Sequence, residues 1–451
     1  MVNVLFLAIG LLVGFFIGYL IHKSKGNSTV DTDDLQILRT QKAVLEEKFR
    51  DQEKTNAIFV VELKEQINQL KNDIDAEREK LAEANKSLEQ SRTYFKAQDE
   101  KLKEQKQQIE ELADLGFLGM MTPIQYGGAG MNTISYVLAM EEISKVDASV
   151  SVCMSVNNSL VCWGLDHYGT EQQKIKYLTP LALGKKDGSI YIGAFLLSEP
   201  EAGSDATHQH TSAVDNGDHF ILNGVKNWIT NGSSASVYLV MAQTDASKGP
   251  KGINAFIVEK NTPGITIGPK ENKMGIRGSD THAISFSDVV VPKENQIGAD
   301  GFGFTFAMKT LNGGRIGIAA QALGIASGAY ELALAYSKQR KSFGKPIHEH
   351  QAIQFKLAEM ATRIQTARLL CYQAAWEKDN GLDYTLSAAM AKLHASDTAM
   401  WVTTEAVQVH GGYGFVKEFH VERLMRDAKI TQIYEGTSEI QKMVIGRSIT
   451  R

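Results

Sequence analysis

A carboxylate close to the C-terminus, Glu435, has the surroundings expected of a general base. It lies between the apolar residues Ile433 and Tyr434 and the small residues 436–438, after which a helical pattern begins at Ser438. An apolar wall removes water from a carboxylate and raises its pKa towards the range in which a base works at neutral pH. The alternative is an exposed acid that the positive end of the following helix stabilises. For an isolated stretch, that plainer interpretation is the stronger one.

Six blocks along the chain resemble, in the right order, the signature segments of acyl-CoA dehydrogenases. They are LSEPEAGSD at 197–205, WITNG at 228–232, LNGGRIG at 311–317, RKSFG at 340–344, QVHGG at 408–412 and YEGTSEIQ at 434–441. The likeness is greatest to the short-chain, butyryl-CoA type, and it runs from about residue 109 to residue 451. It does not cover residues 1–108.

The resemblance implies FAD-dependent α,β-dehydrogenation of short-chain acyl-CoA thioesters to trans-2-enoyl-CoA. Glu435 would remove the α-proton while the β-hydrogen leaves as hydride to flavin N5, and electrons would pass to an electron-transfer flavoprotein. The Glu435 backbone N–H and a flavin ribityl hydroxyl would stabilise the enolate at the thioester carbonyl. Some relatives place the base just before the arginine of the 311–317 block. Gly314 occupies that position here, so Glu435 is the candidate base that the two family patterns leave.

The resemblance also implies how FAD is held. The blocks at 195–204 and 228–230 bring an indole face, hydroxyls and backbone N–H groups to a planar ring, whereas an isolated tryptophan would be assigned to the core. The blocks at 340–351 and 408–412 would reach the FAD of a neighbouring subunit, although a lone Arg340 is as easily a surface cation. No Gly-x-Gly-x-x-Gly follows a strand, so no Rossmann domain is expected. The expected FAD contacts are Phe195, Leu197, Ser198, Ser204, Trp228, Ile229, Thr230, Arg340, Phe343, Gln351, Gln408, Gly411, Gly412, Thr437, Ser438 and Glu439.

Contacts to the acyl-CoA substrate are implied by the same blocks. The expected residues are Ser204, Asn312, Gly313, Gly314, Arg315 and Gly436. Asn312 stands where short-chain members often carry Asp, and Glu201 stands where Gly is common in the family.

The length, net charge and cysteine content of the chain fit a multidomain globular protein. Its 451 residues are enough for two or three domains with sizeable cores. A formal charge of −4 and the lack of a basic stripe argue against a nucleic-acid partner. The three cysteines, Cys153, Cys162 and Cys371, form no Cys-x-x-Cys pair, so we expect neither a disulfide framework nor a metal site. A reducing, cytoplasmic setting suits the globular part.

The first 26 residues predict a transmembrane anchor. Residues 4–21 carry no charged side chain and are followed by His22, Lys23 and Lys25. At about 1.5 Å per residue, this stretch is just long enough to cross a bilayer as one helix. A cleaved signal peptide is less favoured, because no basic n-region or small-residue cleavage site is clear. The lysines predict a single-pass protein of the bacterial inner membrane with its catalytic part in the cytoplasm, or a cytoplasmic protein if the segment is a fusion artefact.

Residues 27–108 predict a long charged helix with a coiled-coil seam. No Gly occurs from 27 to 115, and apolar residues recur every seventh position from Ile67 to Ile109. That period buries a stripe by supercoiling around a partner, with a solvated single helix as the alternative, because companion positions are polar. An anchor followed by a charged coil is similar to the front end of RmuC-type proteins, whose catalytic part is missing here.

The remaining sequence predicts an acyl-CoA dehydrogenase-like chain, mainly α-helical with a central β domain. Residues 109–190 suggest a truncated helical domain, with helices at 134–144 and 149–168. In residues 191–300, six short strand patterns (191–195, 219–222, 237–242, 254–258, 283–286 and 289–291) and turns such as Asn223-Gly224 predict a small antiparallel barrel or sandwich. In residues 301–451, helices at 316–339, 350–380 and 385–409 plus a tail helix predict a four-helix bundle.

Two other functions fit the same sequence. A membrane-anchored scaffold with an inactive dehydrogenase part would lack the yellow colour of bound flavin. An acyl-CoA oxidase would share the fold and produce peroxide. Whichever holds, we expect a dimer or tetramer of the chain.

Overall fold

The computed structural model describes residues 106–450 and, further towards the N-terminus, residues 36, 37, 40, 44, 68, 69, 71–73, 75, 76, 79, 80, 82, 83, 86 and 89, all helical. The chain divides into two compact units, residues 1–97 and 98–451. The predicted anchor at 1–26 and most of the predicted coil at 27–108 lie outside the described residues, so both stay predictions. The second unit contains every predicted site residue.

The second unit begins with helices, as predicted. They are α4 Thr133–Val146, α5 Ala148–Ser155, η3 Val156–Cys162, α6 Trp163–Tyr168, α7 Glu171–Gln173, η4 Lys174–Leu178 and α8 Thr179–Leu183. Side chains cap their first turns: Asn132 accepts from the Ser135 amide, Asp147 from the Ser149 amide, and Thr170 forms a capping box with Gln173. The segment η3 is a π-helix, which the sequence did not predict.

Two asparagines inside η3 join it to the rest of the helical region. The Asn157 amide nitrogen donates to the carbonyl oxygens of Leu118 and Leu181, and its oxygen accepts from the Gly193 amide. Asn158 bonds the Phe117 carbonyl oxygen and the Met120 amide in the same manner. A polar group buried without partners would cost stability, so these bonds explain how two amides are tolerated in an apolar helix.

The β region is one sheet of eight strands. Its strands are β3 Gly193–Leu196, β4 Ser212–Asp215, β5 His219–Thr230, β6 Val237–Gln243, β7 Ile253–Glu259, β8 Ile265–Ile267, β9 Thr281–Pro292 and β10 Gln296–Ile297. The order is β10-β7-β6-β4-β5-β9-β8, and β3 pairs in parallel with β6. In this part of the chain no pairing joins β10 to β8, so the sheet is open. A closed barrel, one of the two expected forms, was therefore wrong.

Two strand predictions need correction. Asn223-Gly224 is no turn: it lies within β5 at a register shift against β9, where a Cβ at position 224 would overlap Thr211. The patterns at 283–286 and 289–291 form the single strand β9, and Asp288 takes a left-handed φ of 51° within it. A bulge therefore produced the local break that looked like a chain reversal.

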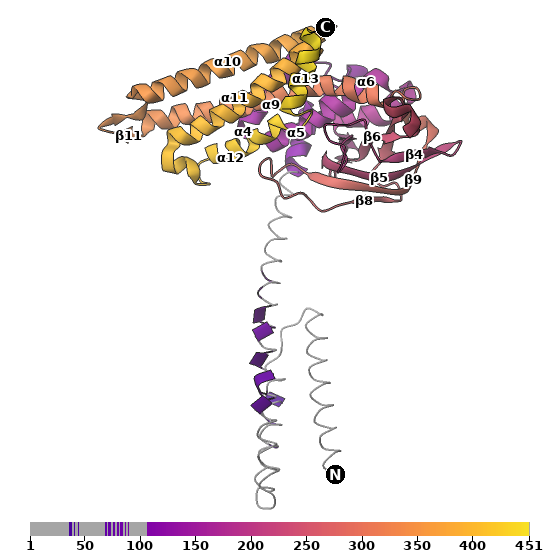
Figure 1. Ribbon diagram of the computed structural model, residues 1–451, viewed down its shortest axis with the longest axis horizontal. Helices are drawn as coiled ribbons and strands as arrows, with labels where there is room; N and C mark the ends of the chain where they lie inside the picture. The colour runs from indigo at the N-terminus through magenta and orange to yellow at the C-terminus, as the bar shows by residue number, and fades with distance from the viewer. Residues whose placement is uncertain are drawn as a thin grey trace, which may run out of the picture. The chain divides into compact units, whose positions relative to one another are not determined.

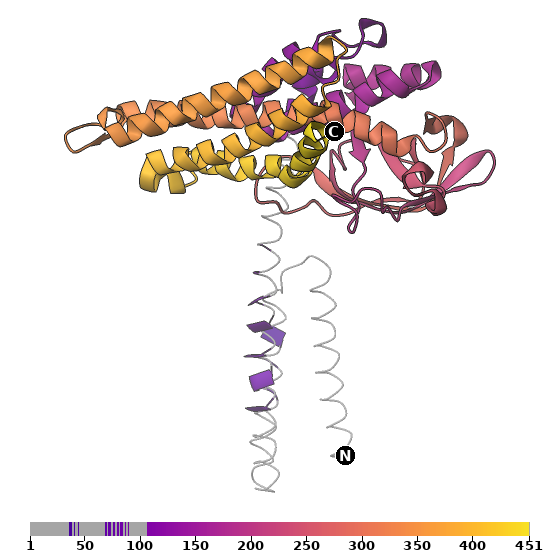
Figure 2. The ribbon, with the colours of Figure 1, turned by 45° about the horizontal axis from the view of Figure 1, so that its top comes forward.

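Long helices form the C-terminal region. They are α9 Gly303–Gln339, α10 Gln351–Asp379, α11 Thr385–His410, α12 Val421–Ala428 and α13 Ser438–Ile449. Figures 1 and 2 show α9, α10 and α11 lying side by side, with α9 reaching from the sheet to the β11–β12 hairpin (Lys341–Ser342 and Lys345–Pro346). Because α9 starts at residue 303 rather than 316, the predicted substrate segment 311–317 lies inside a helix.

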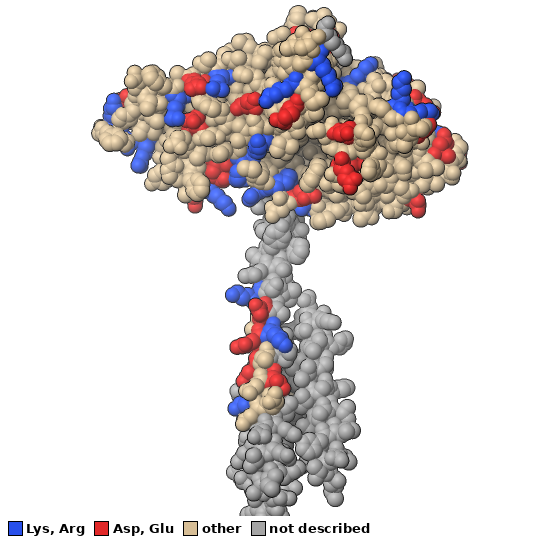
Figure 3. Space-filling model, in the orientation of Figure 1, with Lys and Arg blue, Asp and Glu red and all other residues tan. Residues whose placement is uncertain are grey.

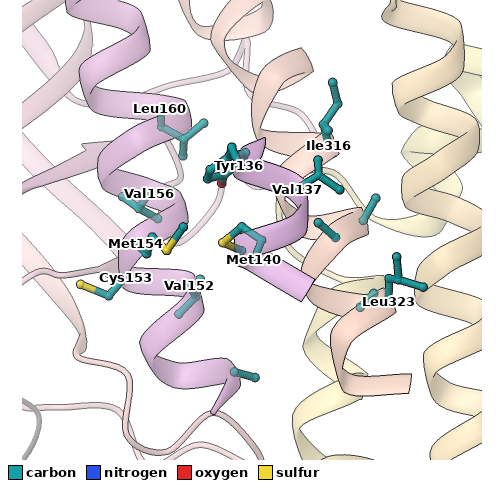
Figure 4. Close-up of a cluster of buried hydrophobic side chains, with 14 of the residues drawn as sticks. Tyr136, Val137, Met140, Val152, Cys153, Met154, Val156, Leu160, Ile316 and Leu323 are labelled. Carbon is teal, nitrogen blue, oxygen red and sulfur yellow. The ribbon is translucent and has the colours of Figure 1, made fainter. Parts of the chain in front are cut away.

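The main core lies where α4, α5, η3 and α9 meet. In Figure 4, Tyr136 and Met140 of α4 lie between the side chains of α5 and η3 and those of α9, such as Ile316 and Leu323. Two apolar helical stretches, Ala148–Tyr168 and Gly303–Gln339, are long enough to span a membrane, but 89% and 72% of their most apolar windows are buried inside the fold. We therefore interpret both as core helices. On the face shown in Figure 3, charges of both signs are interspersed.

Candidate active site

A cavity of about 260 Å³ lies between the sheet, the α5–η3 helix, the first half of α9 and the turn before α13. Ten of the predicted site residues line it. They are Phe195, Leu197, Ser198, Ser204, Trp228, Ile229, Thr230, Arg315, Glu435 and Gly436. The remaining wall is mostly apolar, from Val152, Val156, Leu160, Phe304, Met308, Leu311, Tyr434 and Ile440. One candidate carboxylate thus faces an apolar chamber with a polar side.

Glu435 sits in a turn that sequence alone did not foresee. Its φ is 50° and that of Gly436 is 90°, so a residue with a side chain takes the left-handed conformation. Glu435 Oε2 is buried and has no hydrogen-bond partner among the described residues. Loss of solvent raises the pKa of Glu435 to about 7, although the charges of Lys392 and Arg315 oppose the rise. The plainer interpretation, an exposed acid at a helix start, was wrong.

Gly314 provides the space for this carboxylate. A Cβ atom at position 314 would overlap Glu435 Oε2 and lie 2.8 Å from Leu160 Cδ2. The alternative position that the resemblance implied for a base therefore lies in contact with Glu435 itself. Asn312 and Gly313 are not in the cavity lining: the Asn312 side chain bonds Arg315 Nη1 at 2.7 Å and Thr385 Oγ1 at 3.1 Å. Their contacts to substrate stay predictions.

Two buried cations face the carboxylate. Arg315 of α9 is 6% exposed, its Nε has no partner among the described residues, and burial lowers its pKa. Lys392 of α11 is fully buried and donates from Nζ to the Gly436 carbonyl oxygen at 2.7 Å. Sequence reasoning missed Lys392. A lysine directly after the Ala-rich run 388–391 of a core helix was the available signal.

The start of α13 keeps the turn in place. The Thr437 side chain accepts from the Ile440 amide at 3.3 Å and caps the helix, while Gln441 Nε2 donates to the carbonyl oxygens of Glu435 and Gly436. On the other side, the Tyr434 hydroxyl donates to Gln321 Oε1 of α9. Ser438 is buried and Glu439 is exposed. Of the predicted FAD contacts at 437–439, Thr437 is thus part of the support for the base.

The polar side of the cavity suits a flavin ring. Trp228, with φ 61° and 61% exposure, presents a flat apolar face, so assigning it to the core would be wrong. The Ser204 and Thr230 side chains and the loop between β3 and β4 lie around the same space. An apolar face beside hydroxyls and backbone N–H groups is what a ring with a polar edge requires. The residues present therefore fit FAD.

A buried ion pair fixes the loop that faces this space. Lys226 of β5 donates to Glu199 Oε1 at 2.7 Å, to the Leu197 carbonyl oxygen at 3.0 Å and to Gln209 Oε1 at 3.1 Å. Glu199 also accepts from the backbone amides of residues 210 and 211. Burial lowers the pKa of Lys226 to about 8, and Glu199 opposes this change. Sequence reasoning did not single out this lysine.

The other predicted FAD residues lie elsewhere. Arg340, Gly411 and Gly412 line a second hollow, beside Tyr413, whose ring centre lies 5.7 Å from the Arg340 guanidinium. Phe343 is 94% exposed on the β11–β12 hairpin. Gln351 and Gln408 are also exposed. Within one chain this group and the first are not brought together, and Figure 1 shows the hairpin at the opposite end of α9 from the sheet.

Comparison with known proteins points to one family along most of the chain. Sequence models for the N-terminal, middle and C-terminal domains of acyl-CoA dehydrogenases match residues 75–185, 194–289 and 301–450. The first match begins at residue 75, so the likeness extends further towards the N-terminus than the motifs indicated, into the predicted coil. A charged helix carries few diagnostic residues, which explains why the motifs did not show it.

Individual relatives cover the same region. The short-chain specific acyl-CoA dehydrogenase of Clostridium acetobutylicum is 52% identical over 343 residues, covering 76% of this chain and 89% of that protein. The butyryl-CoA dehydrogenase structure from Megasphaera elsdenii is 53% identical, with a TM-score of 0.74 over 76% of this chain and 89% of that one. A chain solved in work on the electron transferring flavoprotein of Acidaminococcus fermentans has a TM-score of 0.74 at 51% identity, with the same coverage.

Proposed function

Because this chain belongs to the acyl-CoA dehydrogenase family, an FAD-dependent class of enzymes, we propose that it oxidises short-chain acyl-CoA thioesters with Glu435 as the base. The observation that carries the assignment of the base is the position of Glu435. Its Oε2 is buried without a partner in the described part of the chain, at the wall of a largely apolar cavity, with a pKa raised to about 7. Such a carboxylate is half ionised near neutral pH and is poised to accept a proton.

The chain's own residues perform most of the work in this mechanism. Glu435 accepts the α-proton of the thioester, and its backbone N–H donates to the thioester carbonyl oxygen, on which negative charge develops. Arg315 and Lys392 provide positive charge near the Glu435 carboxylate throughout the proton transfer. The apolar wall from Val156 and Leu160 excludes water, which strengthens these interactions.

FAD would be held by the Trp228 face, the hydroxyls of Ser198, Ser204 and Thr230, and the backbone of their loops. When bound, it supplies the acceptor for the β-hydrogen, which leaves the substrate as hydride. The Lys226–Glu199 pair keeps the loop that contains Ser198 and Ser204 in one conformation. Arg340 and the paired glycines at 411 and 412 would meet the FAD of a neighbouring subunit, since they line a different hollow.

Chain length and electron acceptor are assigned by analogy. Relatives named as short-chain specific or butyryl-CoA dehydrogenases support a short acyl chain. A similar chain solved together with work on an electron transferring flavoprotein supports that protein as the acceptor. We also propose a homo-oligomer and a membrane anchor at residues 1–26, for which the sequence pattern is the support. Extraction of membranes with alkaline carbonate should retain the full chain and release one that lacks residues 1–26.

The test of the proposed function is a spectroscopic titration without oxygen. The full chain is purified in mild detergent and butyryl-CoA is added, with palmitoyl-CoA as the long-chain control. We expect a flavin band that bleaches with butyryl-CoA and much less with palmitoyl-CoA. A preparation without flavin would favour the scaffold alternative, and peroxide formed during aerobic turnover would favour an oxidase. A bound flavin that butyryl-CoA leaves oxidised would contradict the short-chain assignment.

A further inference from the structure

Lys392 is a buried cation that the assignment of the base does not require. It lies on α11 and is fully shielded from solvent. No carboxylate of the described residues forms an ion pair with its ammonium group, whose hydrogen bond goes to the Gly436 carbonyl oxygen at 2.7 Å. A lysine buried in this way loses hydration, and burial lowers its pKa to about 8, while Glu435 is the largest opposing influence.

The hydrogen bond of Lys392 acts on the turn that carries Glu435. The Gly436 carbonyl oxygen accepts a second bond from Gln441 Nε2 at 2.9 Å, and the same nitrogen lies 3.2 Å from the Glu435 carbonyl oxygen. Both turn residues have left-handed φ values, 50° and 90°. This conformation is strained for a residue with a side chain and persists only where neighbours hold it. Lys392 and Gln441 are those neighbours.

The charges around the carboxylate come from several elements. Arg315 of α9 and Lys392 of α11 favour the ionised form of Glu435, and Lys392 has the larger effect. The hydroxyls of Tyr136 on α4 and of Tyr434 also face this region, and burial raises the pKa of both far above neutrality, so they stay uncharged. The ionised state of Glu435 therefore depends on the two cations.

Charges of both signs act on Lys392 itself. Glu435, Asp397 and Glu439 favour its charged form, and Arg315 opposes it. Asp397 bonds Gln432 at its carboxylate, and Glu439 is exposed at the start of α13. Of the three acids, only Glu435 lines the cavity, and it has the largest influence on Lys392.

From these contacts we propose that Lys392 is a positioning residue for the base. Its ammonium group holds the Gly436 carbonyl, and with it the left-handed turn at Glu435, while its charge favours the ionised form of the Glu435 carboxylate. This inference rests on the proposed function, because it concerns the same proton transfer. It adds a role to a residue that does not line the cavity.

The test compares Lys392→Met and Lys392→Arg with the wild-type chain across pH 5.5 to 9. The rate of flavin reduction by butyryl-CoA is measured by stopped flow without oxygen, and FAD content is determined for each protein. Lys145→Met is the matched control. Lys145 pairs with Glu331, which lies near the C-terminal end of α9 and away from the Arg315 end. We expect Lys392→Met to move the acid limb of the rate profile upward by about one pH unit or more, since loss of a nearby positive charge makes the carboxylate easier to protonate.

The outcomes distinguish a failure of the inference about Lys392 from a failure of the proposed function. An upward shift in Lys392→Met, with the wild-type limb retained in Lys392→Arg and Lys145→Met, supports the inference. A Lys392→Met profile whose limb stays at the wild-type pH would assign Lys392 to folding alone and overturn it, whatever the maximal rate. Loss of FAD from both Lys392 variants would overturn it as well. A wild-type flavin that butyryl-CoA does not reduce would instead count against the proposed function, and the inference would fall with it.

Discussion

The Glu435 carboxylate lies directly against Gly314, although the two residues are 121 positions apart in the sequence. Glu435 Oε2 occupies the place that a Cβ atom at position 314 would need. The two positions that the resemblance implied for a base, one on α9 and one before α13, therefore lie at the same place. The absence of a side chain at 314 is what allows the carboxylate to lie there.

Gly314→Ala should move the base without unfolding the protein. Alanine favours a helix over glycine by about 1 kcal/mol, so α9 should persist while the new methyl group displaces the carboxylate. A misplacement of about 1 Å lowers rates by about 100-fold, and we expect a loss of that order in flavin reduction by butyryl-CoA, with FAD retained. Gly446→Ala on α13 is the control, because nothing lies within 4 Å of a Cβ there. Wild-type rates in Gly314→Ala would show that the carboxylate works from another position.

A carboxylate placed on α9 at position 314 should be able to replace Glu435 as the base. In Glu435→Gly the carboxylate is lost, and glycine accepts the left-handed φ of position 435 without strain. Adding Gly314→Glu should return a carboxylate to the same wall. We expect the double variant to reduce its flavin with butyryl-CoA at least about 10-fold faster than Glu435→Gly alone, because a base needs only to be within reach of the proton. Equal rates for the two would contradict the shared location.

Glu435→Gln tests the chemical role of the carboxylate directly. The amide has nearly the same shape but cannot accept a proton, so the flavin spectrum should be unchanged. Reduction by butyryl-CoA should fall by at least about 1000-fold, within the range that removal of a general base gives. The measurement is the anaerobic rate of flavin bleaching, with FAD content as the control. A variant that keeps a substantial rate would remove Glu435 from its assigned role.

The pH dependence of the wild-type enzyme should reflect the raised pKa of Glu435. That pKa is about 7, so the base is mostly protonated below pH 7 and mostly ionised above it. Because kcat/KM reports groups of the free enzyme, it should rise with pH through about 7 and then level off. Steady-state assays with butyryl-CoA measure this limb. A limb near pH 4.5, the ordinary value for glutamate, would indicate a solvated carboxylate.

Breaking the Lys226–Glu199 pair should loosen the flavin-facing loop. Lys226→Met leaves the Glu199 charge buried with its ammonium partner removed, which costs about 3–5 kcal/mol in comparable cases. We expect a lower free energy of unfolding in urea and weaker FAD binding, measured by flavin fluorescence on dilution. The double variant Lys226→Met with Glu199→Gln should recover part of the stability, because no unpaired charge remains. Equal destabilisation in both variants would show that packing, not charge, is what Lys226 provides.

Sequence reasoning located the cavity but not what supports it. Glu435, Trp228 and Arg315 were found because they lie in recognisable blocks. Lys226 and Lys392 were missed, since a single lysine in a strand or helix gives no sign of burial until its neighbours are placed. Whether those neighbours serve catalysis depends on distances that no local pattern contains.

The fold was predictable where local rules and packing agree. The ends of α10 and α11 were predicted within one residue, because polar breaks coincide with the helix ends. The start of α9 was not, because Gly313, Gly314 and Gly317 weaken the helical signal. Gly314 is needed for the close approach of Glu435, and Gly317 for those of Tyr136 and Ser155, so tertiary contacts overrode local propensity there.

The π-helical segment Val156–Cys162 gives the cavity wall a property that the other elements of this wall lack. A π-turn contains an extra residue compared with an α-turn, so deleting one residue here could restore an ordinary helix. Every later side chain of that helix would then rotate by about 100° relative to those before it. Leu160 would leave the cavity and a different side chain would take its place. In this enzyme a change of length by a single codon, with no change of residue type, is therefore a route by which evolution or engineering can alter the lining of the substrate chamber.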